Sequence, residues 1–170
     1  VPVLPAIGLP TSRMTVAVPA CTTPCREGME IETEEPRARR VAKAVVELVL
    51  SELPQAPAPH TELAQVAARL EVGEPRWGGA VHGGVDDLRH PYLALRHELC
   101  ISCGRCVRAC DEVQGAFALT ATGRGFEANI AAGLDAGFEE SSCVSCGACA
   151  DTCPTDAISE ISLVKRLKGA

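Results

Sequence analysis

Two cysteine runs with the same spacing constrain this chain more than any other feature of its sequence. Each run places three cysteines at intervals of three residues and a fourth cysteine four residues later. The runs are Cys100, Cys103, Cys106 and Cys110, and then Cys143, Cys146, Cys149 and Cys153, which Pro154 follows. Thiolates at this spacing let one short loop wrap around a corner of an iron–sulfur cubane, with backbone N–H groups turned toward its sulfurs. The spacing therefore predicts two [4Fe–4S] clusters.

The pattern also predicts how the ligands divide between the clusters. In the bacterial ferredoxin run Cx2Cx2Cx3CP, the fourth cysteine of each run binds the other cluster. The first predicted ligand set is Cys100, Cys103, Cys106 and Cys153. The second predicted set is Cys143, Cys146, Cys149 and Cys110. Two clusters that exchange ligands in this way lie close together, so the pattern predicts a short electron-transfer path.

Two other uses of cysteine stay open at this point. Structural zinc also binds CxxC pairs, but it needs four ligands per ion and has no use for a third and fourth cysteine at these offsets in each run. A disulfide framework suits an even cysteine count, yet such scaffolds are shorter chains from oxidising compartments and tolerate irregular spacing. The repeated spacing favours clusters over both.

Composition narrows the function classes. A chain of 170 residues forms one domain or two small ones. Because only 3% of its residues are aromatic, few large side chains can build a core, and bound clusters are expected to stabilise the fold. The net charge of −6 argues against a nucleic-acid partner. No apolar run is long enough for a membrane span, and no signal peptide is recognisable, so a cytoplasmic location is expected.

Periodicity and turn residues predict an α+β fold. The N-terminal part is expected to hold loops and one strand at residues 15–18. Residues 36–53 form a predicted helix with Val41, Val45, Leu48 and Val49 on its core face. A second helix is expected to start after the cap Thr61, to bury Leu63, Val66, Ala67 and Leu70, and to end at Gly73. Residues 74–91 resemble a linker.

The part that holds the cysteines is expected at residues 92–165. Its predicted elements are a strand at 92–95, a helix at 105–113, a hairpin within 117–126 and a closing strand at 157–161. Gly104 and Gly147 each follow the second cysteine of a run. A residue without Cβ lets the backbone turn tightly there.

Longer stretches of the sequence resemble a known family. Residues 90–126 and 138–158 are similar to the two-cluster segment of the alpha subunit of NAD-dependent molybdenum- or tungsten-containing formate dehydrogenases, with DEVQG at 111–115, GRGF at 123–126 and CVSCGAC at 143–149. Residues 19–33 (PACTTPCREGMEIET) resemble the end of the [2Fe–2S] domain in those subunits and in the large iron–sulfur subunit of respiratory NADH dehydrogenase. The resemblance implies a remnant of that domain at 1–35, a helical segment at 36–73 and a two-cluster ferredoxin-like domain at 92–165.

The sequence departs from this family at two sites. Cys21 matches the fourth [2Fe–2S] ligand, but no cysteine precedes it, so no [2Fe–2S] cluster is expected on this chain as given. Relatives often carry a cluster bound by one histidine and three cysteines after the first helix, whereas His60 has no cysteine nearby in sequence. His60, His82 and His97 are therefore expected to be solvated, and His90 to position the chain. Cys25 has no assigned role.

The resemblance implies electron transfer from formate oxidation toward NAD, with flavin- and NAD-reducing iron–sulfur subunits and a molybdopterin catalytic domain or subunit as partners. An alternative is the electron-carrier subunit of an NAD-reducing hydrogenase or an NADH dehydrogenase-type complex. A metal-stapled structural module is a further alternative. No pterin site, nucleotide-binding glycine loop or acid–base pair is recognisable, so no catalytic residue is predicted.

Overall fold

The computed structural model describes residues 3–7, 16–133 and 137–161. The chain divides into two compact units. The first comprises residues 1–51 and 65–78, and the second comprises residues 52–64 and 79–170. The domain boundaries expected from the sequence stay predictions.

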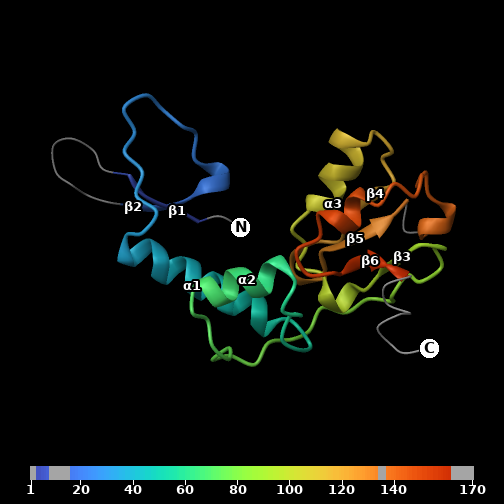
Figure 1. Cartoon of the computed structure of the whole chain (residues 1–170), viewed down its shortest axis with the longest axis horizontal. Helices are drawn as coiled ribbons and strands as arrows, with labels where there is room; N and C mark the ends of the chain where they lie inside the picture. The colour runs from blue at the N-terminus through green and yellow to red at the C-terminus, as the bar shows by residue number, and fades with distance from the viewer. Residues whose placement is uncertain (1–2, 8–15, 134–136, 162–170) are drawn as a thin grey trace. The chain divides into compact units, whose positions relative to one another are not determined.

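The first unit begins with a two-stranded antiparallel sheet. Strand β1 (Val3–Ile7) pairs with β2 (Val16–Pro19), with Val3 opposite Pro19 (Figure 1). The strand expected near 15–18 is thus found as β2, whereas β1 lies where only loops were expected. The expected remnant of a [2Fe–2S] domain stays a prediction, because the side chain of Cys21 lies outside the part of the chain that the structure describes.

Helix α1 (Pro36–Ser51) confirms the first predicted helix. Its first turn is capped by the Glu35 carboxylate, which accepts hydrogen bonds from the backbone N–H groups of Arg37 at 2.8 Å and Ala38 at 3.0 Å. Proline is favourable at the first helical position because the nitrogen there needs no partner within the helix.

The core face predicted for α1 is wrong in part. Val41 and Leu48 are 40% and 50% exposed, whereas Glu47 is 5% exposed. Arg76 explains the burial of this carboxylate, because its backbone N–H, Nε and Nη2 all donate to Glu47 at 2.7–2.9 Å. Burying a charge is tolerated when it is paired and hydrogen-bonded. The partner lies 29 residues away in sequence, beyond the reach of a periodicity argument.

Helix α2 (Glu62–Arg69) confirms the second predicted helix and its cap. The Thr61 hydroxyl accepts the N–H of Ala64 at 3.3 Å, and Leu63 is buried as expected. The predicted end at Gly73 is wrong. The helix ends at Arg69, and Glu71 just beyond it adopts a left-handed conformation with φ of 54°.

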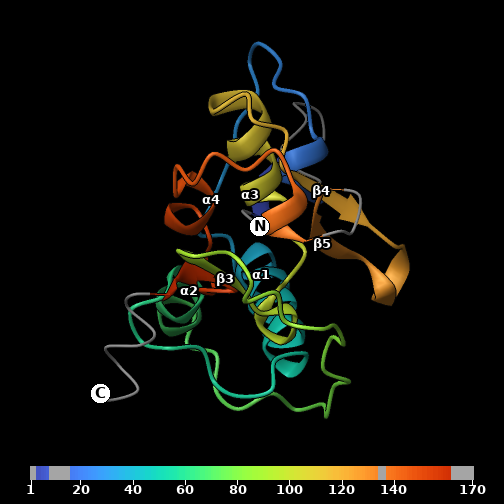
Figure 2. The same ribbon diagram turned by 90° about the vertical axis from the view of Figure 1, so that its right-hand side faces the viewer.

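The described residues of the second unit include two short antiparallel strand pairs and the short α-helices α3 and α4 (Figures 1 and 2). Strand β3 (Leu93–Leu95) pairs with β6 (Ile158–Glu160), and β4 (Leu119–Thr122) pairs with β5 (Asn129–Ala132). Helix α3 (Arg105–Arg108) continues into a π-helical turn at Ala109–Val113, and α4 is Ala148–Asp151. These elements confirm the strand, helix, hairpin and closing strand expected here.

The hairpin turn is wider than the sequence indicated. Residues 123–128 connect β4 to β5, so GRGF lies in the turn and the second strand lies beyond it. Gly123 has φ of 68°, and a Cβ at this position would lie 2.2 Å from the carbonyl oxygen of Glu127. A glycine is therefore required at this turn.

The core of the second unit is built around its cysteines. Cys106, Cys110 and Cys149 are buried within the same apolar cluster as the inward side chains of all four strands. The largest fully buried side chains are Phe138, Leu95 and Ile158. A group bound by these cysteines would therefore lie within the hydrophobic core of the second unit.

Candidate metal centre

The two cysteine runs fold into matching loops. Gly104 and Gly147 have φ of 68° and 81°, as expected from their place after the second cysteine. Ser102 and Ser145, one position before the second cysteine, are also left-handed, with φ of 49° and 58°. Non-glycine residues hold this conformation only where the surrounding structure enforces it, and such residues concentrate at functional sites.

Backbone N–H groups donate to the sulfurs of the first and last cysteine of each run. The four bonds are Ser102 N to Cys100 Sγ at 3.4 Å, Ser145 N to Cys143 Sγ at 3.4 Å, Ala118 N to Cys110 Sγ at 3.2 Å and Ile158 N to Cys153 Sγ at 3.5 Å. A neutral thiol is a weak acceptor, whereas a thiolate is a strong one. The donors are thus arranged for negatively charged sulfur.

The eight cysteines surround two separate cavities. A space of about 330 Å³, including the part open to solvent, is lined by Cys100, Cys103, Cys106 and Cys153. A second space of about 320 Å³ is lined by Cys110, Cys143, Cys146 and Cys149. Among the described residues, no three His, Cys, Asp or Glu side chains converge as they would on a single metal ion. Each cavity combines three cysteines of one run with the fourth cysteine of the other.

The helical segment 105–113 accounts for one half of this arrangement. Cys106 and Cys110 lie four residues apart on it, whereas Cys153 follows Cys149 by the same offset but lies two residues beyond the end of α4. Four residues span about 6 Å along a helix axis, so Cys110 lies about one turn beyond Cys106. The segment 105–113 therefore joins the cavity lined by Cys106 to the neighbouring cavity lined by Cys110.

The buried cysteines favour a positively charged ligand. Burial raises the pKa of the Cys106 thiol and of the Cys149 thiol to about 12, and it also raises the pKa of Cys100. A thiol in such surroundings stays neutral unless a metal compensates the charge of the thiolate. Soft thiolate ligands select iron–sulfur clusters and zinc. The donor set, the N–H groups and the apolar walls fit two iron–sulfur clusters.

The disulfide hypothesis is wrong for the cysteines that the structure describes. All nine cysteines with described side chains are free thiols. Cys25 is exposed and far in sequence from both runs.

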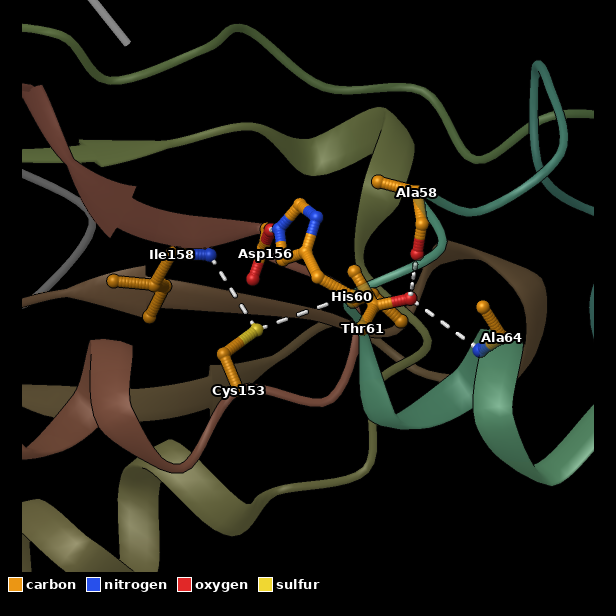
Figure 3. A network of polar contacts seen from close by, with 8 residues as sticks. Ala58, His60, Thr61, Ala64, Cys153, Asp156 and Ile158 are labelled. Carbon is orange, nitrogen blue, oxygen red and sulfur yellow. Dashed lines mark hydrogen bonds and ion pairs between the residues drawn. The ribbon is translucent and has the colours of Figure 1, made fainter. Parts of the chain in front are cut away.

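A segment from before α2 contacts the loop that follows Cys153 (Figure 3). His60 Nε2 lies 2.6 Å from an Asp156 carboxylate oxygen, and the N–H of Leu63 donates to the carbonyl of Pro154 at 3.0 Å. The Thr155 hydroxyl lies 3.7 Å from Cys153 Sγ. His60 was expected to be a solvated loop residue; its side chain is 68% exposed, but it is paired. These contacts hold the start of α2 against the first cavity.

His90 lies beside the second cavity. Its Nδ1 accepts the backbone N–H groups of Tyr92 at 3.0 Å and Leu93 at 2.9 Å, which confirms the expected role in positioning the chain. Its Nε2 lies 3.1 Å from Ser145 Oγ and 3.7 Å from Cys143 Sγ. The residue is 4% exposed, and burial lowers its pKa.

The other two histidines differ from the solvated residues that were expected. The His82 side chain is 13% exposed, stacks on Phe126 with ring centroids 4.5 Å apart, and lies 3.1 Å from a Glu52 oxygen. His97 Nδ1 is buried. The contacts of these residues come from the chain before the cysteine runs and from the hairpin, which the sequence pattern did not connect.

Comparison with known proteins identifies the clusters. Residues 99–157 match the 4Fe-4S dicluster domain family. The chain is 31% identical over 148 residues to the NADP-reducing hydrogenase subunit HndD of Solidesulfovibrio fructosivorans. This aligned region covers 84% of this chain and 25% of HndD. It is also 31% identical over 149 residues to a subunit of an NADH-quinone oxidoreductase of Rhizobium meliloti, and this second aligned region covers 82% of this chain and 17% of that subunit. The chain thus spans a quarter or less of the length of these relatives.

The likeness to formate dehydrogenases covers less of the chain. A putative formate dehydrogenase of Staphylococcus haemolyticus is 34% identical over 73 residues, which is 43% of this chain and 7% of that protein. The formate dehydrogenase assignment is therefore supported less well than the hydrogenase and NADH dehydrogenase alternative, because only the latter relatives match most of the chain.

A solved structure shares the fold. The crystal structure of an NAD+-reducing [NiFe]-hydrogenase in the H2-reduced state contains a chain with a TM-score of 0.76 and 23% identity, covering 94% of this chain and 67% of that chain. None of the described helices is long and apolar enough to cross a membrane. Residues 99–157 form a 4Fe-4S dicluster domain, and the cofactors of this chain are [4Fe–4S] clusters.

Proposed function

We propose that this chain transfers electrons through two [4Fe–4S] clusters within an NAD(P)-reducing hydrogenase or NADH-quinone oxidoreductase-type complex. Cys100, Cys103, Cys106 and Cys153 hold one cluster in this proposal. Cys110, Cys143, Cys146 and Cys149 hold the other. The observation that carries the proposal is the division of the eight cysteines between two neighbouring cavities.

The clusters supply reversible one-electron reduction, and the protein sets where it occurs and at what potential. The protein orients the ligands through the left-handed turns at Ser102 and Ser145, and it directs N–H donors at the ligand sulfurs. Hydrogen bonds to the sulfurs and solvent exposure are two of the determinants of a cluster's potential.

Solvent exposure differs between the two ligand sets. Cys146 is exposed, whereas every ligand of the other set is buried or partly buried. The second cavity therefore has the more open edge, and electron transfer is fastest over short distances. Cys146 marks the side at which an electron donor or acceptor would approach most closely.

The relatives support the choice of complex. Those that match most of this chain are named as subunits of an NADP-reducing hydrogenase and an NADH-quinone oxidoreductase. The partners proposed for this chain are accordingly flavin- and NAD(P)-reacting iron–sulfur subunits. A complex of formate dehydrogenase type is the second candidate, favoured by the likeness of one 73-residue stretch to putative formate dehydrogenases. In that case the partner would be a molybdopterin domain or subunit.

The test is to purify the native complex anaerobically and to follow the reduced clusters by EPR after addition of NADH, NADPH, hydrogen or formate. Rapid reduction by a nicotinamide or by hydrogen is the expected result. Reduction by formate alone would establish the second candidate. Clusters that only dithionite reduces, in a complex that still oxidises its substrate, would show that they lie off the electron path.

A further inference from the structure

The hydrogen bonds around the two cavities are not equivalent. The first cysteine of each run receives a bond from the backbone N–H of the serine two residues later, at 3.4 Å in both runs, and at Cys100 the Ser102 side chain also contributes a hydrogen bond. Cys143 has an additional neighbour, the Nε2 of His90 at 3.7 Å. The structure records no side-chain nitrogen at the corresponding Cys100 among the described residues. His90 precedes the stretch that matches the dicluster family, so that match assigns it no role.

The tautomer of His90 follows from its other contacts. Nδ1 accepts two backbone N–H groups, from Tyr92 and Leu93, and therefore carries no hydrogen. A neutral imidazole then has its single N–H at Nε2. This N–H faces Ser145 Oγ and Cys143 Sγ, so it is a donor shared between a hydroxyl oxygen and a ligand sulfur.

The surroundings hold the ring in place. His90 is 4% exposed, and its ring lies edge-on to Phe138 with centroids 5.5 Å apart. Phe138 is itself 2% exposed and lines the second cavity. A donor fixed by two backbone bonds and a buried aromatic ring loses little entropy when it bonds to a charged sulfur.

We propose that His90 donates an N–H···S hydrogen bond to Cys143 and thereby raises the reduction potential of the cluster that Cys143 holds. The proposal rests on the ligand sets stated under the proposed function. Reduction adds negative charge to the ligand sulfurs, and a donor pointed at them stabilises that charge more than it stabilises the oxidised form. His90 acts as a positioning residue through Cys143 and separates the potentials of two otherwise similar centres.

Two substitutions separate this role from the structural one. His90→Asn keeps an amide oxygen near the position of Nδ1, so the Tyr92 and Leu93 bonds are retained, but it withdraws the donor from Cys143. His90→Gln reaches the position of Nε2 with an amide N–H and gives up the Nδ1 acceptor. Thr155→Val is the matched control, because it removes a hydroxyl 3.7 Å from Cys153 in the other ligand set. His82→Asn controls for loss of a histidine that contacts no cysteine.

The measurement is an anaerobic potentiometric titration of the whole chain followed by EPR, after counting iron and sulfide. With both clusters present, His90→Asn is expected to move one midpoint potential to a more negative value and leave the other unchanged. Thr155→Val should move the other midpoint, His90→Gln should restore the first at reduced thermal stability, and His82→Asn should move neither. Unchanged midpoints in a fully loaded His90→Asn protein would overturn the proposal while leaving the proposed function intact.

A second measurement needs no substitution. In protein labelled with ring-15N histidine, pulsed EPR of the reduced clusters should detect a nitrogen hyperfine coupling transmitted through the hydrogen bond. Absence of any coupling would refute the proposal even if the His90 variants fail to fold. Absence of iron and sulfide from the native protein would instead refute the proposed function.

Discussion

Replacing Cys153 with alanine tests the exchange of ligands between the two runs. Cys153 lies 47 residues beyond Cys106, yet both side chains line the same cavity. The substitution removes one of four ligands from that cavity and none from the cavity of Cys143. One of two four-iron clusters should be lost or damaged, so iron and sulfide are expected to fall from about eight to about four per chain.

The assay that identifies the lost cluster is alkylation of free thiols under anaerobic conditions, followed by peptide mapping. The thiols freed in Cys153→Ala are expected to be Cys100, Cys103 and Cys106. The matched variant Cys110→Ala should free Cys143 and its two neighbours in the second run instead. If Cys153→Ala frees the cysteines of its own run, each run binds its own cluster and the exchange is refuted.

Three further predictions concern stability. Hydrogen bonds from Arg76 lower the pKa of Glu47 from 4.5 to about 2, so the pair stabilises the fold above pH 4.5 and this stabilisation is lost as the pH falls through 2. Glu47→Gln should therefore lower the melting temperature at pH 7, and circular dichroism should show that the difference in melting temperature between variant and parent shrinks in acid. Gly147→Ala should lower the free energy of unfolding by about 1–2 kcal/mol through backbone strain alone, because Gly147 is left-handed and an added Cβ would contact nothing. Gly73→Ala, where an added Cβ also contacts nothing and the backbone is not left-handed, should leave the free energy of unfolding unchanged in the same denaturant titration. Thr61→Ala should cost about 1 kcal/mol through loss of the cap of α2, measured in the same way. Equal melting temperatures for Glu47→Gln and the parent at pH 7 would contradict the role of the Arg76 pair. Equal losses of stability at both glycines would contradict the left-handed strain, and an unchanged denaturation midpoint for Thr61→Ala would contradict the helix cap.

The cysteine loops were predictable because their chemistry is local. A cubane requires ligands at fixed short offsets, so the spacing within each run, together with Gly104 and Gly147, carries most of the information about the loop. The short strands and helices around the runs were predicted from turn residues and patterning, and the structure contains them within a few residues of the expected positions, except β5, which lies beyond the predicted hairpin.

The features that sequence reasoning missed depend on distant partners. Burial of Glu47 requires Arg76, the place of His60 depends on Asp156 almost a hundred residues away, and the bond from His90 toward Cys143 joins residues 53 apart. A lone histidine or glutamate carries no periodic signal, so its partner appears only in the fold. The single clue to His90 in the sequence was its place in HPY just before a predicted strand.

The proposed function depends on two redox-active [4Fe–4S] clusters in this chain. The most direct test is to purify it anaerobically, to count iron and acid-labile sulfide per chain, and to record an EPR spectrum after reduction with dithionite. We expect about eight irons and eight sulfides per chain and a spectrum of two interacting reduced centres. Zinc without sulfide, or iron that dithionite cannot reduce, would contradict it and leave a structural metal module.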